Sequence, residues 1–157
     1  MGSSRGSWRR WRRTLAALAV VVASACGGDG GPTGPDAALA PFVGDWVATE
    51  LVLTSVANPD IAPDLIGLGA VFTMNVQPSG QYTAILIYAQ QASTEIGTLR
   101  VSGNTLTLNR DFPSRAVTSG TYSLSGNVLT LDGNTEFDFN LDGTPDAALV
   151  HFRLVKE

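Results

Sequence analysis

Residues 97–108 (GTLRVSGNTLTL) and residues 120–131 (GTYSLSGNVLTL) repeat one pattern at a fixed offset in the chain. In each copy, apolar and polar residues alternate on both sides of a Gly-Asn pair. Alternation with a period of two is typical of half-buried β-strands, and the Gly-Asn pairs supply the positive φ angles of a tight hairpin turn. Each copy is therefore predicted to be a β-hairpin. A solenoid repeat is the alternative, but only two copies exist and the flanking strands do not continue the period.

Similar alternation continues on both sides of these hairpins. Pro-Ser-Gly at 78–80 and the Asp-Gly pairs at 132–133 and 142–143 are predicted to form turns, and no long amphipathic helix is expected. The predicted fold class is all-β: a single antiparallel up-and-down β-barrel of eight or nine strands, because closure removes exposed sheet edges. The strands predicted outside the two hairpins are 46–53, 71–77, 81–89, 135–140 and 147–156.

The composition sets limits on the function. The chain has 157 residues, enough for one ordinary domain, and its single Cys excludes an intrachain disulfide and a Cys-rich zinc site. Five arginines lie within the first thirteen residues, whereas all 14 acidic residues lie after residue 25. The chain after residue 25 is therefore acidic, which argues against nucleic-acid binding, because that needs clustered Lys and Arg.

The N-terminal residues have the pattern of an export signal. Arginines are followed by an apolar run at 15–22 and by Ala-Ser-Ala directly before Cys26. That run is shorter than the roughly 20 residues of a membrane-spanning helix. Ala-Ser-Ala-Cys resembles the lipobox of bacterial lipoproteins, and this resemblance implies cleavage before Cys26 and attachment of lipid to it. An ordinary secretory signal with an incidental Cys is the alternative.

These features predict three parts of the chain. Residues 1–25 are expected to be a lipoprotein signal peptide, residues 26–40 a lipidated Cys and a Gly- and Pro-rich tether, and residues 41–157 the barrel. The lipobox resemblance implies a protein of the bacterial cell envelope, held at a membrane through its lipid anchor. Gly27, rather than Asp, follows Cys26, which by the same resemblance implies the outer membrane more than the inner one.

The barrel begins with Phe42-Val-Gly-Asp-Trp46. Gly44-x-Trp46 at the start of the first strand resembles the opening motif of lipocalins and, more closely, that of bacterial lipocalin-like lipoproteins; the hairpins at 97–131 also resemble that group. The resemblance covers residues 41–157. It implies that Trp46 lies at the closed end of the barrel and that an arginine near the last strand packs across it. Arg153 is the candidate arginine. Gly44, Trp46 and Arg153 are expected to have structural roles.

The resemblance also implies a small hydrophobic ligand inside the barrel. Apolar and aromatic side chains both line ligand pockets and fill protein cores. The alternative is therefore a non-enzymatic structural or protein-interaction module with a filled barrel. A cavity below roughly 300 Å³ would favour this alternative. The candidate lining residues are Phe72, Met74, Tyr82, Leu86, Tyr88, Leu106, Tyr122, Phe137 and Phe152.

Residues 138–146 contain the spacing of a calcium loop. Asp138, Asn140, Asp142 and Asp146 occupy positions 1, 3, 5 and 9, with glycine at position 6. Position 12 is Leu149 instead of a glutamate, and no helices flank the loop, so an EF-hand is excluded. Calcium is the one candidate cofactor. The alternative is a hairpin turn in which these side chains cap backbone N–H groups.

Two further features bear on function. His151 stands alone, and no nucleophile elbow or His-Glu-x-x-His motif occurs, so no enzyme is expected. A glycosidase-like carboxylate pair is a third class of function, but most carboxylates lie in turns. The irregular stretch 58–69 is rich in apolar residues. By resemblance to lipocalins it would be a lid over the barrel mouth, and a fixed plug is the alternative.

Overall fold

The computed structural model describes residues 37–140 and 142–157, so the predicted signal peptide, Cys26 and most of the tether lie outside the described residues. No helix in these two ranges is long and apolar enough to cross a membrane. The described residues form a short 3-10 helix and eight strands: η1 (Ala40–Phe42), β1 (Gly44–Ser55), β2 (Val71–Val76), β3 (Gln81–Tyr88), β4 (Gln91–Ser102), β5 (Thr105–Phe112), β6 (Ala116–Ser125), β7 (Val128–Phe137) and β8 (Asp146–Lys156).

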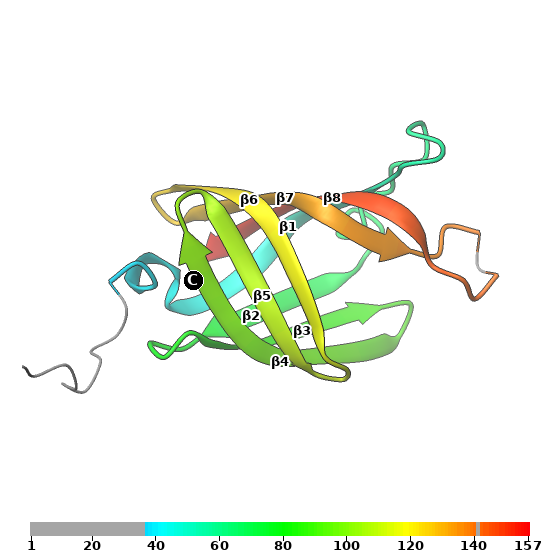
Figure 1. Ribbon diagram of the computed structural model, residues 1–157. Helices are drawn as coiled ribbons and strands as arrows, with labels where there is room; N and C mark the ends of the chain where they lie inside the picture. Colours follow the sequence, from blue (N-terminus) through cyan, green and yellow to red (C-terminus); the bar gives the residue numbers. More distant parts are fainter. Residues whose placement is uncertain (1–36, 141) are drawn as a thin grey trace, which may run out of the picture. The chain divides into compact units, whose positions relative to one another are not determined.

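The strands form a closed antiparallel barrel in which each strand pairs with its neighbours in the sequence (Figure 1). β8 returns to pair with β1 from Trp46 opposite Lys156 to Ser55 opposite Ala148. This pairing leaves neither terminal strand as an open edge. The predicted all-β, up-and-down barrel is confirmed.

Both predicted Gly-Asn hairpins are confirmed. Gly103 and Gly126 have φ angles of +58° and +60°, and each begins a two-residue turn, between β4 and β5 and between β6 and β7. A left-handed residue at the first turn position is typical of a type II′ hairpin, which matches the twist of the flanking strands.

The turn predicted at Asp132-Gly133 is wrong. β7 runs through both residues, so the strand predicted at 135–140 is the continuation of β7 and ends at Phe137. Gly133 lies opposite Gly120 of β6, where a Cβ on Gly120 would come within 2.5 Å of the Asp132 carbonyl oxygen. These glycines are therefore needed for close approach of two strands, which is the second common reason for glycine in a strand.

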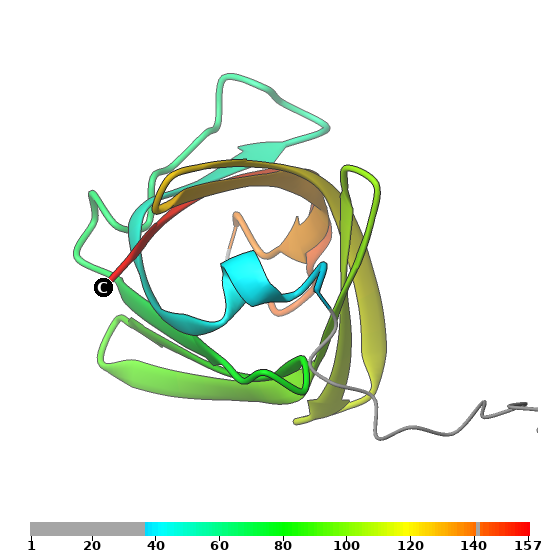
Figure 2. The same cartoon turned by 90° about the vertical axis from the view of Figure 1, so that its left-hand side faces the viewer.

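One end of the barrel is closed by η1, which lies across it (Figure 2). Phe42 of η1 is buried, and its carbonyl oxygen accepts a hydrogen bond of 2.7 Å from the Trp46 Nε1–H. Trp46 is only 1% exposed, and Leu39 belongs to the same buried cluster. The motif tryptophan thus lies at the closed end of the barrel.

The cation beside this tryptophan is not Arg153. Lys156 Nζ lies 5.5 Å from the centroid of the Trp46 ring, because β8 places Lys156 directly opposite Trp46. Arg153 lies three residues earlier, and its Nη1 donates a hydrogen bond of 2.9 Å to Thr49 Oγ1. The arginine predicted to cover Trp46 is thus replaced by a lysine.

The burial pattern of β8 makes a stability prediction with a control on the same strand. Leu154 is 0% exposed and Leu149 is 49% exposed. Leu154→Ala is expected to lower the free energy of unfolding by about 2–5 kcal/mol, because it leaves a cavity in the core. Leu149→Ala is expected to change it by no more than about 0.5 kcal/mol. Urea denaturation followed by circular dichroism measures both; equal losses would contradict the inward and outward assignment.

Candidate functional site

The barrel encloses a cavity of about 380 Å³. Part of its lining comes from the ends of β1, β3 and β7 and the beginnings of β4 and β8, which lie away from η1. The rest includes Tyr82, Leu106 and Leu154, which belong to the same buried cluster as Phe42 and Trp46. The cavity therefore extends from the end opposite η1 inward to the cluster that fills the closed end. Its volume lies near the lower end of the roughly 300–1,000 Å³ of small-molecule pockets.

Seven of the nine predicted lining residues line this cavity. Two of them face each other in an edge-to-face contact, with the ring centroids of Phe72 and Phe152 separated by 4.6 Å. Whether the seven bind a ligand stays a prediction. They are Phe72, Met74, Tyr82, Leu86, Leu106, Phe137 and Phe152.

The other two predicted residues lie elsewhere. The Tyr122 ring packs against Phe42 at a centroid distance of 5.2 Å, and its hydroxyl donates a hydrogen bond of 3.1 Å to the Gly103 carbonyl oxygen. It therefore belongs to the closed end. Tyr88 is the last residue of β3 and packs on the cluster that includes Leu53 and Leu65 without lining the cavity. Alternation alone gave the face of these two tyrosines but not their position along the barrel axis.

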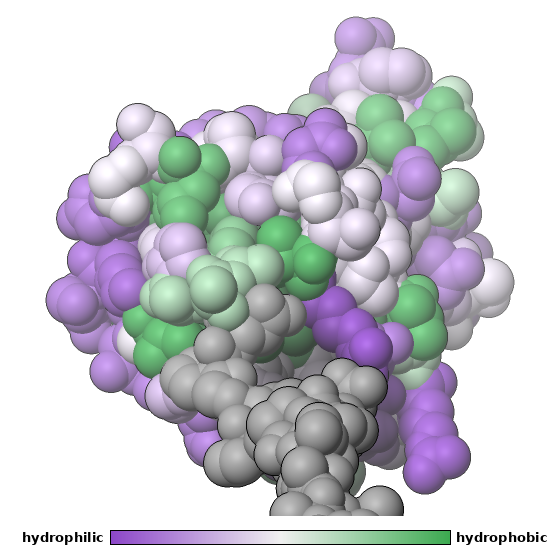
Figure 3. Space-filling model, turned by 60° about the vertical axis from the view of Figure 1, so that its left-hand side comes forward, coloured by the Kyte–Doolittle hydropathy of each residue, from purple (hydrophilic) through white to green (hydrophobic). Residues whose placement is uncertain are grey.

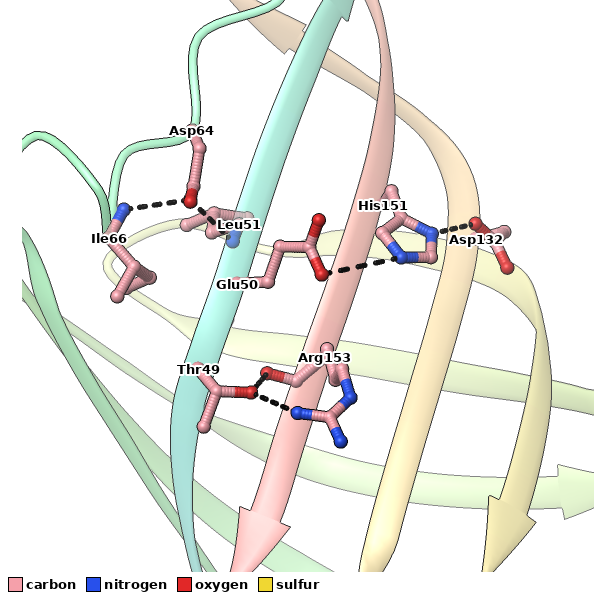
Figure 4. Close-up of polar contacts among 8 residues, drawn as sticks. All are labelled: Thr49, Glu50, Leu51, Asp64, Ile66, Asp132, His151 and Arg153. Carbon is pink, nitrogen blue, oxygen red and sulfur yellow. Dashed lines mark hydrogen bonds and ion pairs between the residues drawn. The ribbon is translucent and has the colours of Figure 1, made fainter.

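The segment between β1 and β2 forms part of the wall. The Leu53 and Leu65 amides donate hydrogen bonds of 3.0 and 2.8 Å to the carbonyl oxygens of Pro63 and Leu51. Asp64 Oδ1 accepts hydrogen bonds from the amides of Leu51 and Ile66 (Figure 4). Leu65 is 2% exposed and lines the cavity. For residues 61–66, these contacts favour the interpretation as a fixed plug and not the interpretation as a lid.

Three polar side chains in the cavity were missed as a group by the sequence analysis. Arg110 Nη1 donates to Glu95 Oε1 at 2.8 Å, and Arg110 Nε donates to the Ser114 carbonyl oxygen at 2.9 Å. The Tyr82 hydroxyl is buried and has no hydrogen-bond partner among the described residues. The sequence could have predicted that Arg110 faces inward, because it follows Leu106 and Leu108 at every second residue of β5, and side chains two residues apart lie on the same face of a strand.

Burial dominates the ionisation of Tyr82. It raises the pKa of the phenol from 10.0 to about 12, and the neighbouring Glu95 carboxylate adds to the rise. The Tyr82 side chain is therefore uncharged at neutral pH and can donate a hydrogen bond.

His151 lies on the outer side of the barrel, since Val150 and Phe152 on either side of it line the cavity. Its Nδ1 is 2.6 Å from Asp132 Oδ1, and its Nε2 is 4.0 Å from Glu50 Oε2 (Figure 4). This arrangement links β7, β8 and β1 across the closing seam. Because all three side chains are partly exposed, each contact is expected to contribute at most about 1 kcal/mol.

The loop at 138–146 has the geometry of a capped turn. The Asp138 carboxylate accepts hydrogen bonds from the Asp142 amide at 3.1 Å and from the Gly143 amide at 2.8 Å. Asn140 Nδ2 donates to Asp142 Oδ2, and the Thr144 amide donates to Asp142 Oδ1 at 2.8 Å. The Thr144 hydrogen bond holds the pKa of Asp142 below its usual range.

The oxygen atoms that would bind calcium are thus engaged with the loop itself. Asp146 instead lies opposite Phe137 at the start of β8. Within the two described ranges, no group of three or more His, Cys, Asp or Glu is placed to hold a metal ion. Calcium binding stays a prediction; a calorimetric titration with calcium that gave no heat, and no rise in melting temperature, would contradict it.

Comparison with protein-family models finds no match, and comparison with curated proteins finds no significantly similar sequence. The cavity and its lining residues are therefore the basis for the proposed function.

The pKa of Tyr82 predicts how stability depends on pH. Between pH 10 and about 12 the unfolded chain loses the Tyr82 proton while the folded protein keeps it. The unfolded state is then favoured, so the free energy of unfolding falls with rising pH across this interval. Tyr82→Phe is expected to make the decrease in the free energy of unfolding with pH shallower. Tyr122→Phe, which keeps Tyr82, is expected to show the same decrease as the wild type. Urea denaturation at several pH values tests this; an unchanged slope for Tyr82→Phe would show that the phenol ionises freely.

Proposed function

We propose that this protein is a lipid-anchored protein of the bacterial cell envelope, similar to lipocalin-like lipoproteins, that binds a small hydrophobic ligand inside its barrel without catalysis. The observation that carries the proposal is the cavity of about 380 Å³. Its volume lies within the roughly 300–1,000 Å³ of small-molecule sites, and a mainly apolar lining with a few polar groups is typical of such sites.

The arrangement of the barrel ends supports a binding role. Trp46, Phe42 and Leu39 fill the end at η1, so a ligand would enter and leave through the opposite end. The apolar wall of that half includes Leu51, Leu86 and Val150. Transfer of a hydrophobic ligand from water to this surface is favourable by about 25 cal/mol per Å² of apolar area buried.

The sequence supports the location. Cys26 follows Ala-Ser-Ala, and the residues between Cys26 and η1 are rich in Gly and Pro, a composition suited to a tether. Lipid on Cys26 would hold the barrel at a membrane, with stable anchoring when more than one chain is attached. Gly27 after this Cys favours the outer membrane over the inner one.

The alternative is a structural or protein-interaction module. Several apolar side chains lie on the outer surface, among them Val117, which is 70% exposed, and Leu68, which is 63% exposed. On the face in Figure 3, the described apolar side chains form separate patches among polar ones. Scattered apolar residues of this kind are ordinary on protein surfaces, whereas a partner site usually presents a contiguous patch. The cavity favours the binding role.

A cavity-filling variant tests the proposal. Ala84 lines the cavity, whereas Ala92 of β4 is exposed. The neutral dye N-phenyl-1-naphthylamine is expected to fluoresce on binding to the purified full-length protein. Ala84→Phe is expected to weaken this binding at least about tenfold by occupying the space, and Ala92→Phe to leave it unchanged.

Circular dichroism checks that both variants retain the barrel. Native mass spectrometry of the wild-type protein complements the dye, because a co-purifying lipid would support the binding role. Wild-type protein that binds neither dye nor lipid, or an Ala84→Phe variant that binds dye as well as the wild type, would contradict a ligand site inside the barrel.

A further inference from the structure

The Tyr82 hydroxyl is a buried polar group that the described residues leave unsatisfied. Tyr82 is 2% exposed and lines the cavity, yet its oxygen has no hydrogen-bond partner among the described residues. Folded proteins pair the great majority of their buried polar groups, and an unpaired hydroxyl lowers stability. The Glu95 carboxylate lies close enough to raise the pKa of this phenol, but no hydrogen bond of ordinary geometry joins the two groups. A polar group that enters the cavity between them can therefore accept the hydrogen bond of the hydroxyl.

The register of three strands places two charged residues near this hydroxyl. Tyr82 of β3 lies opposite Gly97 of β4, and Gly97 lies opposite Arg110 of β5. Gly97 has no side chain, so nothing on β4 separates Tyr82 from Arg110 in this row. Glu95 lies two residues from Gly97 and also lines the cavity. Tyr82, Glu95 and Arg110 thus form one polar cluster in an otherwise mainly apolar lining.

The hydrogen bonds within the cluster determine what it can accept. Arg110 is engaged by Glu95 Oε1 through Nη1 and by the Ser114 carbonyl oxygen through Nε. Its charge is therefore neutralised by a carboxylate. The Tyr82 phenol can donate one hydrogen bond, and the Glu95 carboxylate can accept hydrogen bonds beyond the one from Arg110. The cluster offers a donor and an acceptor, with no unpaired cation.

The cavity offers no unpaired cation to an anionic ligand. The charged lining residues are Glu95, Arg110 and Glu136. Glu95 and Arg110 form an ion pair without net charge, and Glu136 is exposed at the rim, between the inward residues Thr135 and Phe137. At Tyr82, the negative charges of Glu95 and Asp111 raise the pKa of the phenol, and the positive charge of Arg110 lowers it by more than Asp111 raises it. The other polar lining residues, Ser93 and Thr135, are uncharged. A carboxylate moved from water into this cavity would lose hydration without gaining a free cation.

From this geometry, and resting on the proposed function, we infer that the ligand is a neutral amphiphile. Its hydroxyl or amide group accepts a hydrogen bond from the Tyr82 hydroxyl and donates one to the Glu95 carboxylate, and its apolar part lies against Phe72, Leu106 and Phe152. Long-chain alcohols and amides belong to this class, whereas fatty-acid anions are disfavoured because the site has no unpaired cation to replace their hydration. Discrimination arises because an unpaired buried polar group, on ligand or protein, weakens binding.

An eight-carbon series with different head groups tests this inference: 1-octanol, octane, octanoate and octylammonium, each measured by displacement of N-phenyl-1-naphthylamine from the full-length protein at neutral pH. The wild type is expected to bind 1-octanol at least about tenfold more tightly than octanoate. Tyr82→Phe is expected to weaken 1-octanol about tenfold and to leave octane unchanged. Tyr122→Phe, which removes a hydroxyl outside the cavity, is the matched control and is expected to change neither.

A second variant keeps the test independent of Tyr82. Glu95→Gln preserves the size of the side chain but removes its charge, which leaves Arg110 without its carboxylate partner. Octanoate affinity is therefore expected to rise at least about tenfold, reversing the preference of the wild type.

The outcomes separate this inference from the proposed function. If no member of the series, octane included, displaces the dye, the proposed function fails. If octane displaces the dye but Tyr82→Phe leaves the 1-octanol affinity unchanged, the inference alone is overturned. Tighter binding of octanoate or octylammonium than of 1-octanol by the wild type would equally overturn it.

Discussion

The structure depends on the pairing of β8 with β1. An eight-stranded antiparallel sheet has two edges, and each edge exposes backbone N–H and C=O groups that need partners. The β1–β8 register from Trp46 to Ser55 satisfies both edges at once. β2 pairs with β1 only from Gly44 to Val47, so the far half of β1 needs another partner on that side. The 61–65 segment supplies it through hydrogen bonds to Leu51, Leu53 and Ser55.

Closure gives the barrel one inside, and side-chain size then makes its two halves different. At one end η1 brings Phe42 and Leu39 against Trp46, and these large side chains fill the interior. Further along the interior, Ala84 of β3 lies at the edge of the same buried cluster and lines the cavity. Gly97 of β4, opposite Tyr82, has no side chain, so both positions leave space. The same alternation thus produces a packed core at one end and a cavity at the other. The polar cluster lies in the half with space, where a ligand could reach it.

Much of the fold followed from the sequence because the relevant signals are local. Alternation marked the strands, and Gly-Asn marked two hairpins. The Asp132-Gly133 pair misled, since its glycine serves close strand packing instead of a turn. The turn between β3 and β4 escaped notice because Ala89 and Gln90, with φ angles of +50° and +64°, adopt a conformation usually taken by Gly or Asn.

The site was less predictable because it depends on contacts between distant strands. Alternation identified inward residues, but the volume left between them depends on barrel closure. The Lys156 contact with Trp46 depends on the register of β1 and β8. The hydrophobic pattern does not fix this register, because a shift by two residues keeps the same side chains on the inner face. The Tyr82, Glu95 and Arg110 cluster needs the registers of β3, β4 and β5 together. No motif in the sequence encodes that combination.

The central claim is that the closed barrel encloses space that its own side chains do not fill. Crystals of the protein pressurised with xenon test it most directly, because xenon occupies empty apolar cavities. We expect xenon density inside the barrel, among Phe72, Leu106 and Phe152, and none at the end filled by Trp46. An interior without xenon, in which side chains meet across the barrel, would show that the barrel is filled.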